Sequence, residues 1–125
     1  MLMKKILCIE DDPDIADVIE LALGDQYTLM VITDAKEVMN TISVFIPDLI
    51  LIDNYIGFVQ AADVMKDIKT LPGFEDTPFI LCSGHADIKN IALKMSASAY
   101  LEKPFELSDL YNTIDQVLCH RTTDN

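Results

Sequence analysis

The chain has 125 residues, half of them hydrophobic, and a formal charge of −12 from 9 basic and 21 acidic side chains. This length suits one domain, and this apolar content is enough to fill a core, which excludes intrinsic disorder. An acidic field repels nucleic-acid phosphates and anionic lipids, so we expect neither as a partner. No apolar stretch approaches the roughly 20 residues of a membrane span. The first ten residues also lack the apolar core of a signal peptide, so we expect a cytoplasmic protein.

Short apolar runs alternate with segments of helical periodicity along the chain. The runs predict five strands, at Ile6–Ile9, Tyr27–Ile32, Leu49–Ile52, Phe79–Cys82 and Ala99–Leu101. Apolar residues spaced by three and four predict helices that begin near Pro13, Ala35, Ala61, Asp87 and Glu106, the last ending at about His120. Such alternation predicts a doubly wound α/β domain over residues 1–120, with a parallel sheet covered on both faces. Residues 121–125 are expected to form a polar C-terminal tail.

Polar side chains directly follow four of the predicted strands. They are Glu10 and Asp11 after the first strand, Asp53 after the third, Ser83 after the fourth and Lys103 after the fifth. In an open parallel sheet, functional sites lie beyond the carboxyl ends of the strands, so these groups should converge. Clustered carboxylates repel one another unless a cation compensates, and Mg²⁺ prefers such oxygen ligands. Carboxylates, a hydroxyl and an ammonium around a metal suit phosphoryl transfer, with an aspartate as the acceptor.

Each of these residues also has an ordinary interpretation when it is taken alone. Asp12 is as good a helix cap as a ligand, Asp53 suits a turn, and Lys103 before Pro104 suits a solvated position. The joint placement of the whole set at strand ends favours a functional site. The cysteines are widely spaced, and Cys8 and Cys82 lie in apolar runs, so we expect them to pack as small hydrophobes.

Four segments, over about residues 4 to 119, resemble the receiver domain of two-component response regulators. They run Ile6-Leu7-Cys8-Ile9-Glu10-Asp11-Asp12-Pro13, Pro47-Asp48-Leu49-Ile50-Leu51-Ile52-Asp53, Pro78-Phe79-Ile80-Leu81-Cys82-Ser83-Gly84 and Ala99-Tyr100-Leu101-Glu102-Lys103-Pro104-Phe105. Any one of them is a weak signal, but all four in this order and spacing are specific. The resemblance implies a flavodoxin-like fold with the strand order 2-1-3-4-5, in a single domain similar to the chemotaxis regulators.

The resemblance also implies a role for each acidic residue. Asp53 resembles the phosphoacceptor. Glu10 and Asp11 resemble the pair that holds Mg²⁺, with Asp11 the more direct ligand. Tyr55 would add its backbone carbonyl to the metal. The phosphoryl group would come from a sensor histidine kinase or a phosphotransfer protein.

The remaining implied roles concern the response to phosphorylation. Ser83 resembles the switch hydroxyl, Lys103 the lysine that pairs with the phosphoryl group, and Tyr100 the aromatic residue that turns inward on activation. They would couple the site to the surface of the fourth helix, fifth strand and fifth helix, which would bind a target protein or a second copy. We therefore expect a signalling switch with self-catalysed phosphotransfer and dephosphorylation rather than an enzyme.

Four positions depart from the family pattern or vary within it. Gly57 and Ala61 replace a usual proline and glycine, which predicts a loop after Asp53 that is less stiffened. Tyr55 places a bulky phenol beside the acceptor, which suggests a long-lived phosphorylated form. His85 is either a general base or, more simply, a solvated loop histidine.

Two other functions stay open for this sequence. A pseudo-receiver that serves as an interaction scaffold would share the fold but would not need the intact acidic set with Ser83 and Lys103. A small Mg²⁺-dependent phosphohydrolase would need a second acid two residues after the nucleophile, where this chain has Tyr55. A flavin site would need a phosphate-binding loop after the first strand, where acids stand instead.

Overall fold

A computed structural model describes residues 3–123, with side chains described through residue 119. A parallel five-stranded sheet has the order β2-β1-β3-β6-β7. Its strands are β1 (Lys5–Ile9), β2 (Thr28–Ile32), β3 (Leu49–Asp53), β6 (Phe79–Ser83) and β7 (Ala99–Glu102). This order is the expected 2-1-3-4-5, because the two remaining strands form a separate hairpin after β3. The doubly wound, flavodoxin-like fold is thus confirmed.

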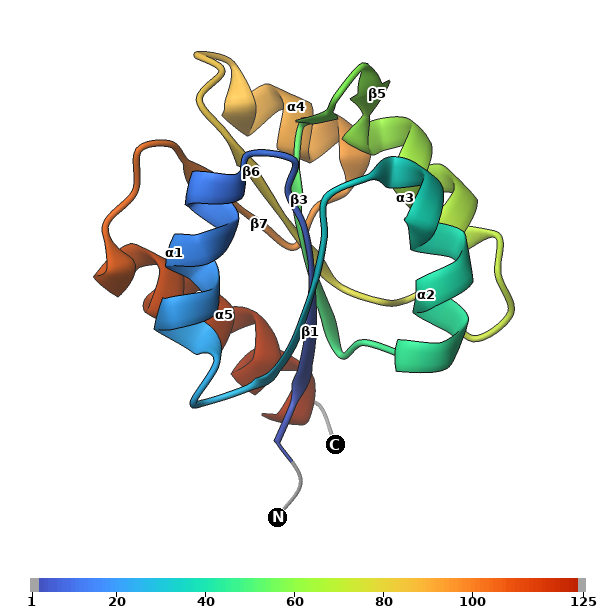
Figure 1. The fold of residues 1–125 in the computed structure, drawn as a ribbon, viewed down its shortest axis with the longest axis horizontal. Coiled ribbons are helices and arrows are strands. Elements are labelled where there is room, and N and C mark those ends of the chain that lie inside the picture. The colour runs from blue at the N-terminus through green and yellow to red at the C-terminus, as the bar shows by residue number, and fades with distance from the viewer. Residues whose placement is uncertain (1–2, 124–125) are drawn as a thin grey trace.

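Five α-helices cover the two faces of this sheet (Figure 1). They are α1 (Pro13–Leu23), α2 (Val38–Phe45), α3 (Ala61–Lys69), α4 (Ile88–Met95) and α5 (Leu107–Thr123). Helices α1 and α5 lie on one side of the sheet, and α2, α3 and α4 lie on the other. Within residues 3–123, none of these helices is long and apolar enough to cross a membrane.

The strands are buried on both faces, which explains their continuous apolar runs. Because successive side chains in a strand point to opposite faces, Ile6 and Cys8 pack with α1 and α5, whereas Leu7 and Ile9 pack with the other three helices. Cys8 and Cys82 are buried free thiols, as expected. Burial raises the pKa of Cys82 to about 12, so this thiol stays protonated and packs as an apolar group.

The starts of the first two helices are fixed by aspartates. The Asp12 side chain accepts hydrogen bonds from the backbone N–H groups of Asp14 and Ile15, and Pro13 is the first residue of α1. Asp34 instead caps a short 3₁₀ helix, η1 (Ala35–Glu37), by accepting the Lys36 N–H. The helix expected from Ala35 therefore begins as a 3₁₀ turn and becomes α-helical at Val38.

Several boundaries differ from the sequence-based expectation. Asp53 and Ser83 are the last residues of β3 and β6 rather than the first residues of loops. Helix α5 continues to Thr123, so the first three residues of the expected tail are helical. No glycine or proline follows His120 to stop the helix earlier. Residues 124–125 of that tail lie outside the described residues.

The segment after Asp53 forms a small hairpin that the sequence did not predict. Strands β4 (Tyr55–Ile56) and β5 (Val59–Gln60) pair antiparallel around Gly57 and Phe58. Gly57 has φ +63°, and a glycine at the first position of a two-residue loop is typical of a type II′ turn. The expected loop is therefore a paired turn, in which glycine adopts a conformation that proline would not; whether it is less stiff than a proline-containing loop stays a prediction.

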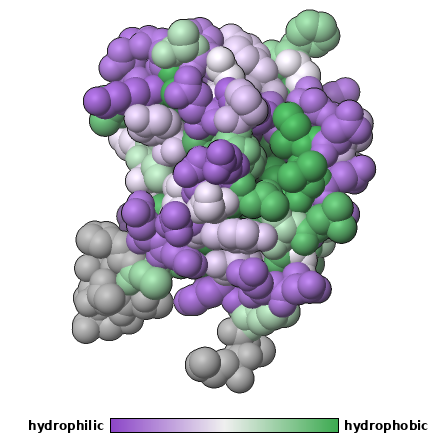
Figure 2. All heavy atoms as spheres, turned by 90° about the vertical axis from the view of Figure 1, so that its left-hand side faces the viewer, coloured by the Kyte–Doolittle hydropathy of each residue, from purple (hydrophilic) through white to green (hydrophobic). Residues whose placement is uncertain are grey.

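The side of the molecule built from α1 and α5 is largely hydrophilic, with hydrophobic side chains gathered along one edge (Figure 2). Elements at the β2 end of the sheet expose several large apolar residues, among them Val18 and Leu21 of α1 and Met30 of β2. The rest of this surface carries the charged residues expected from the composition.

Candidate functional site

Three carboxylates meet at the carboxyl edge of the sheet. Ligand atoms of Glu10, Asp11 and Asp53 all lie within 4.8 Å of one another. The register of the sheet produces this cluster, because Ile9 of β1 pairs with Ile52 of β3 and each acid follows its strand partner. Glu10 is only 2% exposed, whereas Asp11 is exposed. The cluster therefore has a buried side at Glu10 and an open side at Asp11, and together with Lys103 it is called the acidic pocket below.

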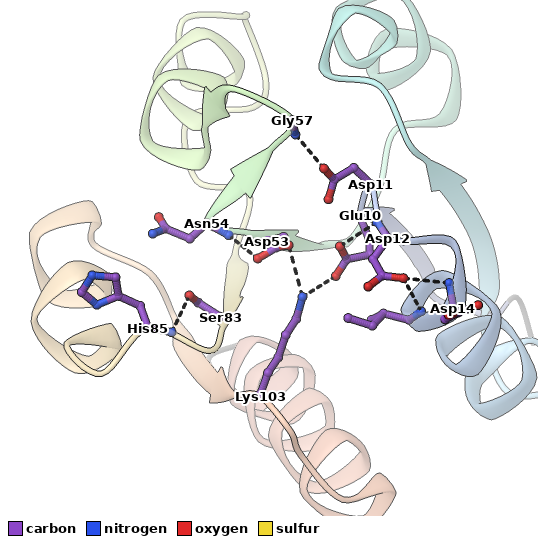
Figure 3. A network of polar contacts seen from close by, with 11 residues as sticks. Glu10, Asp11, Asp12, Asp14, Asp53, Asn54, Gly57, Ser83, His85 and Lys103 are labelled. Carbon is purple, nitrogen blue, oxygen red and sulfur yellow. Dashed lines mark hydrogen bonds and ion pairs between the residues drawn. The ribbon is translucent and has the colours of Figure 1, made fainter.

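Lys103 completes this pocket from the segment after β7 (Figure 3). Its Nζ lies 2.6 Å from Oε1 of Glu10 and 3.1 Å from Oδ2 of Asp53. The peptide bond between Lys103 and Pro104 is cis. The Lys103 N–H also donates to the Ser83 carbonyl at 2.9 Å, which ties the lysine backbone to β6. One ammonium thus bridges carboxylates from β3 and from the end of β1.

The pKa values of both Glu10 and Lys103 are raised in this pocket. Burial raises the pKa of Glu10 to about 7, although the hydrogen bond from Lys103 opposes that shift. For Lys103, burial alone would lower the pKa, but the Glu10 and Asp53 carboxylates outweigh it and raise the pKa above its usual value. The lysine therefore remains charged, but its one positive charge does not balance the carboxylates around it.

The donor set of the pocket fits a small divalent cation. Three carboxylates lie around one ammonium, so negative charge remains to be neutralised. Glu10 already accepts hydrogen bonds on both oxygens, from Lys103 and from the Asp12 N–H at 3.2 Å. Asp53 accepts the Asn54 N–H on Oδ1 at 2.8 Å. Hard carboxylate oxygens of this kind, from one or two acids plus water, are what Mg²⁺ prefers.

Ser83 lies on the neighbouring strand and has a different partner. Its hydroxyl is buried, and Oγ accepts the backbone N–H of His85 at 3.0 Å. The His85 ring is turned away from the acidic pocket, and its Nδ1 accepts the Asp87 N–H at 3.0 Å (Figure 3). This arrangement places His85 in its own loop and does not direct it toward Asp53.

The two tyrosines named from sequence lie outside the cluster of charged groups. Tyr100 of β7 is 41% exposed, so its ring is on the surface rather than in the core. Tyr55 is 48% exposed, and its hydroxyl accepts a hydrogen bond from Gln60 Nε2 across the hairpin at 3.1 Å. The proposed contact of the Tyr55 carbonyl with a metal stays a prediction.

Besides the Asp12 N–H that donates to Glu10, two backbone donors in the site were not predicted from the sequence. Gly57 donates its N–H to Asp11 Oδ2 at 2.8 Å, and Asn54 donates to Asp53. The signal for the first was available, because Gly57 interrupts a run of β-formers after the predicted strand and is typical of a tight hairpin turn. The pocket therefore combines side chains from strand ends with backbone groups from the following segment.

Comparison with known proteins identifies the family of this fold and site. The profile of the response regulator receiver domain matches residues 6–115. The chain belongs to this family. Glu10, Asp53, Ser83 and Lys103 all lie within the matched residues, so the pocket lies inside the unit that defines the family.

The relatives are distant in sequence and close in fold. The chain is 25% identical over 112 residues to the DNA-binding response regulator MtrA of Mycolicibacterium smegmatis, covering 87% of this chain and 48% of that protein. The chain thus spans about half the length of the MtrA proteins it matches. A putative response regulator from Chloroflexus aurantiacus superposes with a TM-score of 0.85 at 25% identity, over 94% of this chain and 98% of that one.

A second solved structure supports the fold alone. The CheY-like receiver domain protein from Methanospirillum hungatei superposes with a TM-score of 0.87 at 24% identity, covering 98% of this chain and 99% of that chain. Receiver domains generally bind Mg²⁺, and Glu10, Asp11 and Asp53 form an acidic cluster that could hold it here.

Proposed function

We propose that this receiver domain accepts a phosphoryl group on Asp53, and that the acyl phosphate switches a protein-binding surface. The observation that carries the proposal is the position of Asp53, which lies in an acidic cluster with one carboxylate oxygen 3.1 Å from the Lys103 ammonium. An anionic nucleophile beside a cation that neutralises phosphoryl oxygens is the arrangement that phosphoryl transfer requires.

The donor in this proposal is a phosphohistidine of a sensor kinase or phosphotransfer protein. An Asp53 carboxylate oxygen attacks phosphorus and the bond from phosphorus to the imidazole nitrogen breaks. The ring, already protonated on its other nitrogen, leaves as neutral imidazole. Glu10, Asp11 and Asp53 would hold Mg²⁺, which supplies charge neutralisation at the phosphoryl oxygens when bound. Lys103 would shift from its two carboxylates toward the new anion, since its ammonium is already next to Asp53.

The response in this proposal passes through Ser83 and Tyr100. The Ser83 hydroxyl would leave the His85 N–H and donate to the phosphoryl group, and Tyr100 would leave the surface for the space that this movement opens. The readout would be the surface of α4, β7 and α5, which would bind a target protein or a second copy. Leu93 of α4 is also exposed, which gives such a surface an apolar anchor.

Under this proposal the domain is a signalling switch rather than an enzyme, because it is itself the substrate that is modified and later hydrolysed. A donor kinase that uses ATP would act in the cytoplasm, where ATP is present, so the domain would be located there too. The acidic surface makes a basic docking patch the favourable partner and nucleic acid an unfavourable one.

Intact mass after incubation with acetyl phosphate tests the proposal. We expect the addition of one phosphoryl group that requires Mg²⁺ and disappears in Asp53→Asn. The variant Asp17→Asn, which removes an exposed carboxylate from α1, is the matched control and should be modified like the wild type. Modification that persists in Asp53→Asn would contradict Asp53 as the acceptor. No modification by either acetyl phosphate or phosphoramidate would contradict the proposal and favour the pseudo-receiver scaffold.

A further inference from the structure

The hairpin after β3 reaches across to the loop after β1 through a single hydrogen bond. The Gly57 N–H donates to Oδ2 of Asp11 at 2.8 Å, between residues 46 positions apart (Figure 3). This is the hydrogen-bond donor that the structure gives to the Asp11 side chain. Asp11 itself is exposed and stands on irregular backbone between β1 and α1, so little else fixes its carboxylate.

The Gly57 donor is held in place by the rest of the hairpin. Ile56 is 3% exposed and packs in the core, which anchors the first strand of the hairpin. Tyr55 pairs with Gln60 and Ile56 with Val59 in antiparallel register. At its base, the Ala61 N–H donates to the Asn54 carbonyl at 2.8 Å. The N–H of Gly57 is therefore presented by ordered backbone rather than by a free loop.

A proline could not supply this contact. It has no N–H, and its φ is fixed near −65°, whereas Gly57 has φ +63°. A side chain other than proline would find space, because a Cβ added at Gly57 meets nothing within 4 Å. There is room for a side chain, but the positive φ strains any residue other than glycine, so the position requires a backbone donor in a conformation that favours glycine.

We propose that the Gly57 N–H is a positioning group that orients the Asp11 carboxylate for Mg²⁺ and makes metal affinity depend on the hairpin. The inference rests on the divalent-cation site of the proposed function. A hydrogen bond on one oxygen of a ligating carboxylate leaves the other oxygen directed at the metal, and loss of such partners typically lowers metal affinity. By linkage, bound Mg²⁺ in turn stabilises the turn that donates the hydrogen bond.

The variant Gly57→Pro tests the proposal, and the chain offers a matched control in Gly73→Pro. Gly73 also has a positive φ, of +90°, and a Cβ added there also meets nothing within 4 Å. Its N–H likewise donates to a carboxylate, that of Glu75, at 2.8 Å. Mg²⁺ binding to each purified protein is measured by titration calorimetry. We expect Gly57→Pro to weaken Mg²⁺ binding by about 10- to 100-fold, and Gly73→Pro to bind like the wild type.

Gly57→Ala keeps the N–H, although its side chain is strained at a φ of +63°. It should bind Mg²⁺ much closer to wild type than Gly57→Pro does. Amide hydrogen exchange of Gly57 gives a readout that does not need metal, since Asp11→Ala should speed this exchange in the metal-free protein. Far-UV circular dichroism of each variant establishes that the fold is retained.

The outcomes distinguish this inference from the function on which it rests. Wild-type binding of Mg²⁺ with equal or tighter binding by Gly57→Pro overturns the positioning role alone. Absence of Mg²⁺ binding by the wild type overturns the metal site of the proposed function and this inference together. Gly57 exchange that is unchanged in Asp11→Ala also overturns the positioning role, because the hydrogen bond would then not protect the amide.

Discussion

The carboxyl edge of the sheet has two regions that differ in how their side chains are held. In the acidic pocket, formed by Glu10, Asp11, Asp53 and Lys103, every side chain has a polar partner that is distant in sequence or on another element. On the switch side, formed by Ser83, His85 and Tyr100, the hydroxyl and the imidazole bond to their own loop, and the tyrosine is exposed.

This difference follows from what builds each region. Lys103 and Glu10 are 93 residues apart and meet because the sheet brings their strand ends together. Ser83 and His85 are two residues apart, so a local turn decides their contact. A pocket set by the register of the sheet is as stable as the fold, whereas a local contact can exchange for another of similar energy. The first region suits a fixed reaction site, and the second suits a movable response.

Among substitutions in these two polar regions, removal of the Lys103 ammonium should produce the largest loss of stability. Lys103→Met leaves Glu10 buried beside Asp53 without a cation, which we expect to lower the free energy of unfolding by about 1–3 kcal/mol. Uptake of a proton by Glu10, whose pKa burial already raises, limits the loss. Urea unfolding measures the change, and Lys94→Met on the exposed face of α4 is the control. Equal shifts in the two variants would show that the pocket is not held by its lysine.

Truncation of Tyr55 tests the part of the acidic pocket next to the hairpin, and we expect it to have a smaller effect. If the phenol hinders the attacking water, Tyr55→Ala should speed loss of the phosphoryl group by about fivefold, since a barrier change of about 1 kcal/mol gives that factor. Intact mass over time after removal of the donor measures the rate. Tyr55→Phe keeps the ring and loses only the hydrogen bond from Gln60, so it should decay like the wild type. Unchanged decay in Tyr55→Ala would exclude the shielding role.

Substitution of Tyr100 should have the smallest effect on stability. Tyr100 is 41% exposed and belongs to neither core cluster, so Tyr100→Ala should change the free energy of unfolding by less than about 0.5 kcal/mol. The adjacent Leu101 is 5% exposed and serves as the inward-facing control, for which alanine should cost about 2–5 kcal/mol. A large destabilisation by Tyr100→Ala, in the same urea assay, would mean that the switch side is packed rather than free to move.

Much of the fold and the membership of the pocket could be predicted from the sequence. The apolar runs Leu49–Ile52 and Phe79–Cys82 are short, continuous and bounded by polar or turn residues, which is typical of strands buried on both faces. Parallel strands place their carboxyl ends at one edge, so Glu10, Asp53 and Lys103 had to converge once the topology was known. The family resemblance added the roles of these residues, which geometry alone does not assign.

The features that the sequence did not predict depend on backbone conformation. The hairpin strands Tyr55–Ile56 and Val59–Gln60 have only two residues each, too few to show a period of two. The absence of a proline at Gly57 suggested a loose loop, whereas the glycine N–H ties the turn to Asp11. The orientation of His85 likewise depends on a turn in which Asp87 donates to its ring, and no residue pattern specifies that hydrogen bond.

A crystal structure with Mg²⁺ and beryllofluoride, a mimic of the phosphoryl group, tests the phosphorylation switch most directly. We expect beryllium attached to an Asp53 carboxylate oxygen, with Lys103 and the Ser83 hydroxyl donating to its fluorides. The hydrogen bond from the His85 N–H to Ser83 should then be broken, while Glu10 and Asp11 remain in place around the metal. Beryllofluoride bound away from Asp53, or bound there with Ser83 still accepting the His85 N–H and Tyr100 still exposed, would contradict this mechanism.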